Sequence, residues 1–229
     1  MKFLLNIFFP KFCIGCKKIG RSICSSCYQE MVFIQKQMCP YCKKVSMYGY
    51  THEACKAEKG IEGAMSLLEY QGITKKFIKD IKYQRIFSEL EDFFLLLPSC
   101  KKEEVIKNIS LYQIDYILPI PLHKQKQKIR GFNQAEKIAE YIAKYIKVPV
   151  IDILDRQKNT SPQAQIKKKQ DREVNIKNAF KYKGKSEHIG KNILLIDDLF
   201  TTGSTTKEAT KELKEKGIKD VFVFTLAHG

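Results

Sequence analysis

Residues 192–205 read NILLIDDLFTTGST, and this stretch decides the fold. Residues 192–196 are a continuous, mainly apolar run, which is typical of a central parallel strand covered on both faces. Two carboxylates, Asp197 and Asp198, follow at its C-terminal end. Ligands of open α/β sheets bind just outside the carboxyl ends of the strands. The stretch therefore predicts an α/β fold with a parallel sheet and a ligand site at Asp197 and Asp198.

A loop of small residues follows the two carboxylates and leads into a lysine- and glutamate-rich helix that reaches about Lys216. Backbone N–H groups at the start of a helix point outward and carry the positive end of its dipole, so they bind anions. Hydroxyl groups add donors, and Gly203 permits close approach of the backbone. We expect a phosphate site made of Thr201, Thr202, Gly203, Ser204 and Thr205. The alternative is an Asp-Asp turn before a threonine-rich helix cap.

Residues 193–205 closely resemble the thirteen-residue signature of type I phosphoribosyltransferases. The resemblance implies a doubly wound parallel sheet that binds phosphoribosyl pyrophosphate with Mg²⁺. It assigns the 5-phosphate to the loop Thr201–Thr205 and the ribose hydroxyls to Asp197 and Asp198. The loop is not a Walker loop, because the lysine after the glycine is missing. Purine-salvage members carry an aspartate at the position of Thr201, so purine salvage is not expected here.

Seven of the eight cysteines lie before residue 56, mostly in pairs separated by two residues. That spacing lets both thiols of a pair reach one ion, and two pairs complete a tetrahedral zinc shell. We expect a first structural zinc on Cys13, Cys16, Cys24 and Cys27, and a second on Cys39, Cys42, His52 and Cys55. For the second site the alternative is that His52 is an exposed loop histidine, which would leave only three cysteines for a metal. Disulfides are the other alternative, but they suit secreted proteins, and no export signal is evident.

Composition sets the domain organisation and the class of partner. The chain has 229 residues, 44% of them hydrophobic, and a net charge of +16. We expect a zinc-binding module over residues 1–60 and a phosphoribosyltransferase-like domain over residues 61–229. The charge favours single-stranded nucleic acid or phosphorylated metabolites, although a lysine bias spread over solvated faces would also explain it. Residues 1–9 are interpreted as a short amphipathic helix; without a membrane span, the expected location is cytoplasmic.

The middle of the chain predicts a strand at 63–70, a helix, and a second helix that ends at Pro98. The apolar stripe of the second helix is Phe87, Leu90, Phe93, Phe94 and Leu97. A further strand at 116–123 runs into a loop, and a helix follows Arg130-Gly131-Phe132-Asn133-Gln134. Lys124 and Arg130, cations just past a strand end, are candidates for the pyrophosphate side of the site. Asn133 and Gln134 could fix substrate or cap the helix.

The cysteine pairs, Lys82-Tyr83, the segment 116–134 and the C-terminal signature together resemble the ComF/GntX family of competence-associated proteins over essentially the whole chain. His52 departs from the cysteine usual in that family. The resemblance implies a zinc module on a phosphoribosyltransferase domain that handles single-stranded DNA during natural transformation. An enzyme with an unknown acceptor is one interpretation, and a non-catalytic binder of nucleic acid or phosphoribosyl groups is another. In the latter, the lysines around 124–128 and 167–169 track the strand. The third interpretation is an interaction protein that docks a DNA-uptake helicase.

Overall fold

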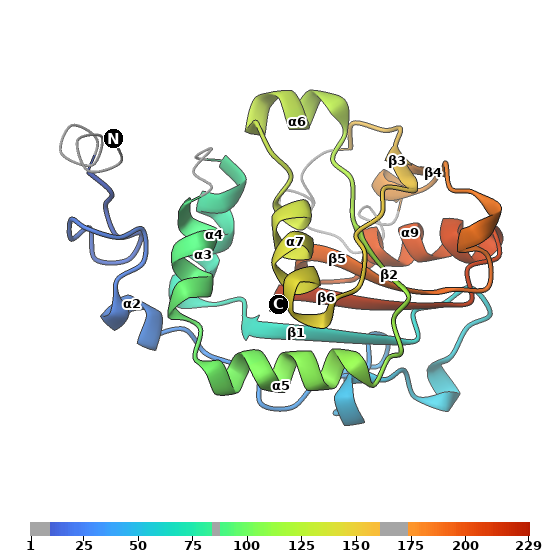
Figure 1. Ribbon diagram of the computed structural model, residues 1–229, viewed down its shortest axis with the longest axis horizontal. Coiled ribbons are helices and arrows are strands. Elements are labelled where there is room, and N and C mark those ends of the chain that lie inside the picture. Colours follow the sequence, from blue (N-terminus) through green and yellow to red (C-terminus); the bar gives the residue numbers. More distant parts are fainter. Residues whose placement is uncertain (1–9, 84–87, 161–173) are drawn as a thin grey trace.

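A computed structural model describes residues 10–83, 88–160 and 174–229 (Figure 1). Its centre is a parallel sheet with the strand order β1-β6-β5-β2. The strands are β1 (Gly63–Glu69), β6 (Asp220–His228), β5 (Asn192–Phe200) and β2 (Tyr116–Pro119). Because all four strands run in the same direction, their carboxyl ends meet at one edge of the sheet. The expected amphipathic helix at residues 1–9, along with Phe87 and the lysines at 167–169, lies outside the described residues.

Strand β5 is longer than the sequence predicts. The apolar run ends at Ile196, but β5 continues through both carboxylates, because Asp197 pairs with Thr225 and Phe200 with His228 in the neighbouring strand β6. The two carboxylates therefore lie inside the paired part of β5, near its carboxyl end, and not in a loop beyond it. Their backbone positions are fixed by the ladder, which holds their side chains at the carboxyl edge.

Helices cover both faces of the sheet, which confirms the doubly wound α/β class. One face packs against α3 (Gly72–Tyr83), α4 (Ser88–Leu96), α5 (Ser99–Ser110) and α7 (Gln134–Ile146). The other face packs against α9 (Ser204–Glu215) and a small antiparallel sheet of β3 (Leu154–Arg156) and β4 (Phe180–Tyr182). Residues of β5 alternate between the two cores, with Leu194 facing the first and Leu195 the second. This alternation explains the apolar run of the sequence, since both faces are buried.

The expected buried stripe of α4 is confirmed for Leu90, Phe93, Phe94 and Leu97, which are all buried. Between β2 and α7 the chain forms an additional helix, α6 (Lys124–Arg130), where the sequence indicated a loop. Within the described residues, no helix combines the length and apolar character needed to cross a bilayer.

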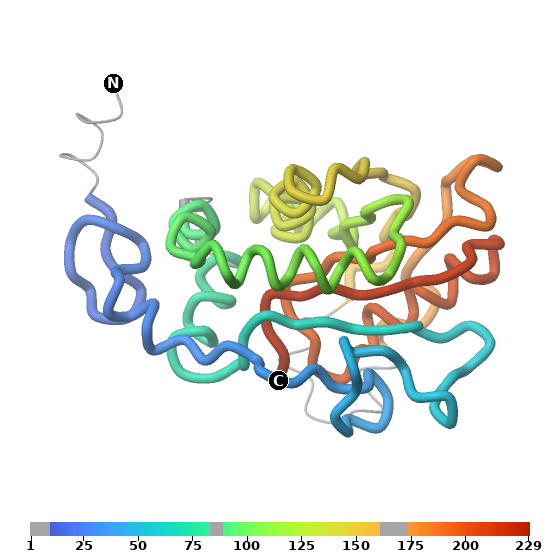
Figure 2. Tube along the Cα trace, turned by 60° about the horizontal axis from the view of Figure 1, so that its bottom comes forward, coloured from blue at the N-terminus to red at the C-terminus, as the bar shows by residue number. Residues whose placement is uncertain are grey.

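The cysteine-rich segment packs directly on the sheet. Residues 32–34 run antiparallel to β1, with Ile34 donating its N–H to Leu67 O at 3.0 Å and Glu69 donating to Val32 O at 2.9 Å. This pairing covers the outer edge of β1, which would otherwise expose unpaired backbone groups. Figure 2 shows the same stretch leading from α2 (Ser25–Gln29) along β1 to the second group of cysteines.

Candidate functional site

The first group of cysteines is arranged for one metal ion. The four Sγ atoms lie within 4.8 Å of one another, and this cluster is called the first tetrad: Cys13, Cys16, Cys24 and Cys27. Ligands about 2.3 Å from a tetrahedral zinc ion are separated by about 3.8 Å, so small movements close the shell. Burial raises the pKa of Cys13, but backbone N–H groups outweigh it and lower the pKa to about 6. The thiolate that zinc requires is therefore favoured at this position.

The first tetrad is part of the main core. Cys13 and Cys27 are buried, and the ring of Tyr28 lies 6.0 Å from that of Phe93 in α4. Ser22 donates its backbone N–H to Asp92 of the same helix at 2.9 Å. The first tetrad thus supports α4, and through it the layer that contains α3.

The second tetrad comprises Cys39, Cys42, His52 and Cys55, whose ligand atoms also lie within 4.8 Å of one another. His52 Nδ1 is 3.3 Å from Cys42 Sγ, and its Nε2 is 3.2 Å from Val45 O. A carbonyl partner on Nε2 places the proton there and leaves Nδ1 to bind metal, the usual arrangement of a zinc-bound histidine. His52 therefore faces the cysteines, and both donor sets fit structural zinc with no position left open for substrate.

The predicted phosphate loop joins β5 to α9. Gly203 is the N-cap of α9 and has a left-handed backbone with φ 71°. A Cβ atom at this position would lie 2.6 Å from the ring of Phe200. Glycine is therefore required both by the backbone angle and by the Phe200 ring beneath the loop. The Phe200 ring occupies the Cβ side of Gly203, and close approach of the Gly203 backbone to a phosphate stays a prediction.

Hydroxyl groups line the start of α9. Thr202 Oγ1 lies 2.6 Å from Ser204 Oγ, and Thr206 donates its hydroxyl to Gly203 O at 3.0 Å. The first turn of α9 contains no acidic residue. The positive end of the helix dipole is thus not neutralised within its own helix. Thr201 and Thr205 are half-buried beside these residues.

A lysine from a distant helix lies against the two carboxylates. Lys82 Nζ, at the end of α3, is 2.9 Å from Asp198 Oδ1, and Asp198 is 6% exposed. The sequence alone assigns Lys82 no role of its own, because nothing local shows that α3 ends beside β5. The family resemblance, which includes Lys82-Tyr83, was the only signal that pointed to it.

The surroundings of Asp197 strongly raise its pKa. Burial and the negative charge of Asp198 raise the pKa of Asp197 to about 7, against the opposing effects of Lys82 and Arg156. Burial alone would lower the pKa of Lys82, but the charges of Asp198 and Asp197 raise it. Two carboxylates held this close favour a cationic or hydroxyl-donating partner.

Three further cations act on Lys82 or on one another, and the four are called the cation group: Lys82, Lys126, Arg130 and Arg156. Burial, with the charges of Arg156, Arg130 and Lys82, lowers the pKa of Lys126 to about 8. Burial and Arg130 lower the pKa of Arg156 even though Asp197 opposes them. These shifts show that the four charges lie close enough to repel one another.

The four residues predicted for the pyrophosphate side of the site have different surroundings in the structure. Arg130 belongs to the cation group, whereas Lys124 is exposed on α6. Asn133 caps α7, because its side chain accepts the N–H of Ala135 at 3.1 Å. Gln134 is buried, accepts from Arg130 at 3.3 Å and donates to Ile81 O at 2.7 Å. Gln134 therefore orients Arg130 beside the end of α3.

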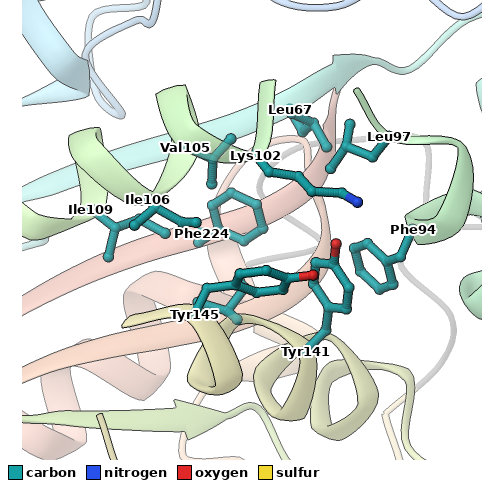
Figure 3. A pocket seen from close by; sticks show the side chains of 11 residues that line it. Leu67, Phe94, Leu97, Lys102, Val105, Ile106, Ile109, Tyr141, Tyr145 and Phe224 are labelled. Carbon is teal, nitrogen blue, oxygen red and sulfur yellow. The ribbon is translucent and has the colours of Figure 1, made fainter. Parts of the chain in front are cut away.

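A separate cavity between α4, α5 and α7 lies away from this edge (Figure 3). Phe94, Tyr141 and Lys102 line it, and it encloses about 30 Å³. That is about the volume of one water molecule in the liquid, too small for a nucleotide or a sugar phosphate.

Comparison with known proteins agrees with both ends of the chain. Residues 4–57 match the double zinc ribbon domain, and residues 129–229 match the phosphoribosyl transferase domain. Competence protein F of Haemophilus influenzae is 28% identical, over 96% of this chain and 98% of its own length. ComFC of Bacillus subtilis is 28% identical, over 91% of this chain and 85% of its own. DNA utilization protein YhgH of Escherichia coli is 25% identical, over 89% of each chain.

Among solved structures, adenine phosphoribosyltransferase from Leishmania tarentolae aligns with 57% of this chain and 72% of its own. The identity is 11% and the TM-score 0.33, a likeness too weak to carry an argument. The chain is thus similar to competence proteins F and ComFC over most of its length, with a match to the double zinc ribbon domain ahead of a match to the phosphoribosyl transferase domain.

Proposed function

We propose that this protein binds phosphoribosyl pyrophosphate as its magnesium complex at the carboxyl edge of the sheet. In this proposal the loop Thr201–Thr205 and the first turn of α9 hold the 5-phosphate. Asp197 and Asp198 accept hydrogen bonds from the ribose hydroxyls. The pyrophosphate group lies against the cation group, to which α6 contributes Lys126 and Arg130.

The observation that carries the proposal is the charge balance of the site. Lys82 forms an ion pair with Asp198, and the charge of Asp197 acts on Arg156. Lys126 and Arg130 lie close enough to repel these two cations, and the first turn of α9 has no acidic residue. The cations lower or oppose one another's pKa, so an anion bound beside them would be stabilised by several positive charges. A ligand with several phosphates relieves that repulsion, while the paired carboxylates suit hydroxyl groups and magnesium. Phosphoribosyl pyrophosphate combines all of these features.

Magnesium prefers oxygen ligands and is commonly held by one or two carboxylates together with substrate phosphates. Asp197 and Asp198 are the carboxylates that fit this role. When bound, the ion would neutralise charge on the pyrophosphate group. Asp197 would need to lose its proton first, because its pKa is raised to about 7.

The homologues support a role in competence and DNA uptake. Within that role we propose that the protein handles single-stranded DNA, with phosphoribosyl pyrophosphate binding as a separate property of its pocket. The net charge of +16 supports binding to a polyanion. Lys124 and Lys128 are exposed on α6, outside the cation group, and are available to contact a phosphate backbone.

Calorimetric titration of the zinc-loaded protein tests the pocket. Separate titrations use phosphoribosyl pyrophosphate with magnesium, ribose 5-phosphate, and pyrophosphate. We expect the complete ligand to bind most tightly. Lys126→Gln should weaken binding of the complete ligand and of pyrophosphate, but not of ribose 5-phosphate. Lys124→Gln is the matched control on the same helix. Absence of heat and of thermal stabilisation at millimolar ligand would disprove the proposal.

A transferase activity is favoured by a second feature of the same edge. A recess of about 640 Å³ lies at the ends of β1 and β6, lined by Lys43, Tyr70 and His228. The ring of His228 is 5.4 Å from that of Phe200, which supports the phosphate loop. Burial and the charge of Lys43 lower the pKa of His228, so its imidazole is neutral at pH 7 and can accept a proton.

In this second candidate function an acceptor nitrogen forms a bond to C1 of the ribose. The bond from C1 to the pyrophosphate oxygen breaks, and His228 takes the proton from the acceptor. Release of pyrophosphate, measured with ammonia, free nucleobases or single-stranded DNA as acceptor, tests it. His228→Asn should lower the rate of release without weakening the binding of phosphoribosyl pyrophosphate. If none of the acceptors causes release, the protein is a binder and not a transferase for these classes.

A further inference from the structure

The second tetrad is connected to the phosphate loop through two side chains. Tyr41 lies between the ligands Cys39 and Cys42, so its backbone is held by the same turn that holds the metal. Its hydroxyl accepts the N–H of Ile61 at 2.8 Å, just before β1. This bond fixes the Tyr41 ring between the second tetrad and the sheet, where it also packs against the core below α9.

The ring of Tyr41 contacts a lysine of α9. Lys207 Nζ lies 4.8 Å from the centre of the Tyr41 ring, a cation–π contact. The same Nζ donates to Thr202 O at 3.2 Å. Lys207 also donates its backbone N–H to Gly203 O at 2.8 Å. Lys207 therefore binds two carbonyls of the loop, one through its backbone and one through its side chain. The ring of Tyr41 holds that side chain in place.

We infer that Tyr41 and Lys207 are positioning residues through which the second tetrad sets the conformation of the phosphate loop. Loss of metal from the second tetrad frees the turn that carries Tyr41, and the ring then no longer holds Lys207 against Thr202. The N–H groups that receive the 5-phosphate lose their fixed arrangement. Zinc in the second tetrad would thus regulate ligand affinity without contacting the ligand. This inference rests on the proposed function of the loop.

Two variants test the contact while the metal ligands stay intact. Tyr41→Leu removes the ring, and Lys207→Met removes the charge but keeps most of the aliphatic chain. Both should retain the zinc content of the wild type. Each should bind the magnesium complex of phosphoribosyl pyrophosphate about two- to fivefold more weakly, the range expected for a cation–π contact at a partly exposed site. Lys211→Met, an exposed change one turn further along α9, is the matched control and should bind like the wild type.

Hydrogen exchange provides a readout that does not require the ligand. Amides of residues 203–207 should exchange faster in Tyr41→Leu, in Lys207→Met and in His52→Ala than in the wild type or in Lys211→Met. Unchanged exchange in the first two variants, or in His52→Ala after confirmed loss of one zinc, would overturn the inference. A wild-type protein that fails to bind phosphoribosyl pyrophosphate would disprove the proposed function, and the exchange measurement would still decide whether the second tetrad positions the loop.

Discussion

The two tetrads use similar ligands but serve different surroundings. The first tetrad has four thiols, two of them buried, and packs on α4 inside the main core. The second has three thiols and an imidazole, and Tyr41, which lies between two of its cysteines, contacts Lys207 of α9 with its ring. A metal site inside a core determines whether the protein folds, whereas a site at the periphery can adjust one neighbouring element and leave the fold intact.

Each tetrad contacts elements that contribute residues to the candidate site. The first packs on α4 beside α3, and α3 supplies Lys82 to the carboxylates. The second contacts the loop Thr201–Thr205 through Tyr41 and Lys207. Ligand binding should therefore respond to both tetrads, but folding mainly to the first. The following experiments test this distinction, in order of decreasing expected effect.

Cys16→Ser should have the largest effect. Zinc binding to a structural site amounts to about 10–16 kcal/mol in isolated zinc-finger peptides, comparable to the whole stability of a domain. Loss of the first zinc should release Tyr28 from Phe93 and unfold the front of the protein together with α4. Zinc analysis and thermal unfolding measure this. The control is Cys100→Ser, since Cys100 is exposed and belongs to neither tetrad. A Cys16→Ser protein as stable as the control would remove the distinction between the tetrads.

Asp197→Asn combined with Asp198→Asn should have the next largest effect, on binding. Hydrogen bonds to charged groups contribute about 1.5–3 kcal/mol each, so loss of two should weaken phosphoribosyl pyrophosphate more than about a hundredfold. The same change leaves Lys82 without its carboxylate partner. Pyrophosphate alone should then bind at least as tightly as in the wild type, because the cation group becomes more positive. Parallel weakening of both ligands in calorimetry would show that the variant has lost the pocket and not only the hydroxyl acceptors.

The pH dependence of the free energy of unfolding tests the raised pKa of Asp197. Its pKa is raised from 3.8 to about 7, so between these values the folded chain binds more protons than the unfolded chain. The free energy of unfolding of the ligand-free protein should therefore fall as pH rises through this window and level off above it. Asp197→Asn should flatten the dependence. Affinity for the magnesium complex should change in the opposite direction and rise as Asp197 loses its proton. Thermal unfolding with and without ligand, on both sides of that pKa, measures both trends.

His52→Ala should act on the second tetrad alone. We expect zinc content to fall by no more than one equivalent while the sheet stays folded, because no ligand of the first tetrad is touched. Cys42→Ser is its companion, since Cys42 occupies the same place in its pair as Cys16 does in the first. Affinity for phosphoribosyl pyrophosphate should fall severalfold in both. An unchanged zinc count in His52→Ala would return His52 to the role of a surface histidine.

The sequence was sufficient for the parts that depend on local chemistry. The cysteine spacing predicts both tetrads, and the apolar run at 192–196 predicts a strand covered on both faces. It was insufficient where distant segments meet. The approach of Lys82 to Asp198 depends on the packing of α3 beside β5. The sequence predicts Lys124 for the pyrophosphate side, but the orientation of α6 places Lys126 in the cation group instead. The contact of Tyr41 with Lys207 joins the two ends of the chain, and no local pattern records it.

The smallest effect, on DNA affinity alone, is expected from lysines that belong neither to the cation group nor to the loop Thr201–Thr205. Lys124 and Lys128 are exposed on α6, so in single-stranded DNA binding they should act only through counterion release. For single strands, the slope of log affinity against log salt is about −0.7 for each phosphate contact. The double variant Lys124→Gln with Lys128→Gln should therefore reduce the slope by about 1.4. Lys126 is left intact because it belongs to the cation group, and a change there would mix the two kinds of binding.

Measuring the same slope in His52→Ala completes the test. DNA binding that depends on α6 alone should keep its salt dependence when the second tetrad loses its metal, whereas binding of phosphoribosyl pyrophosphate should weaken. If the slope of His52→Ala falls as much as that of the lysine variant, the second tetrad itself contacts the strand. Its role would then extend beyond the phosphate loop, and the assignment of DNA binding to α6 alone would be wrong.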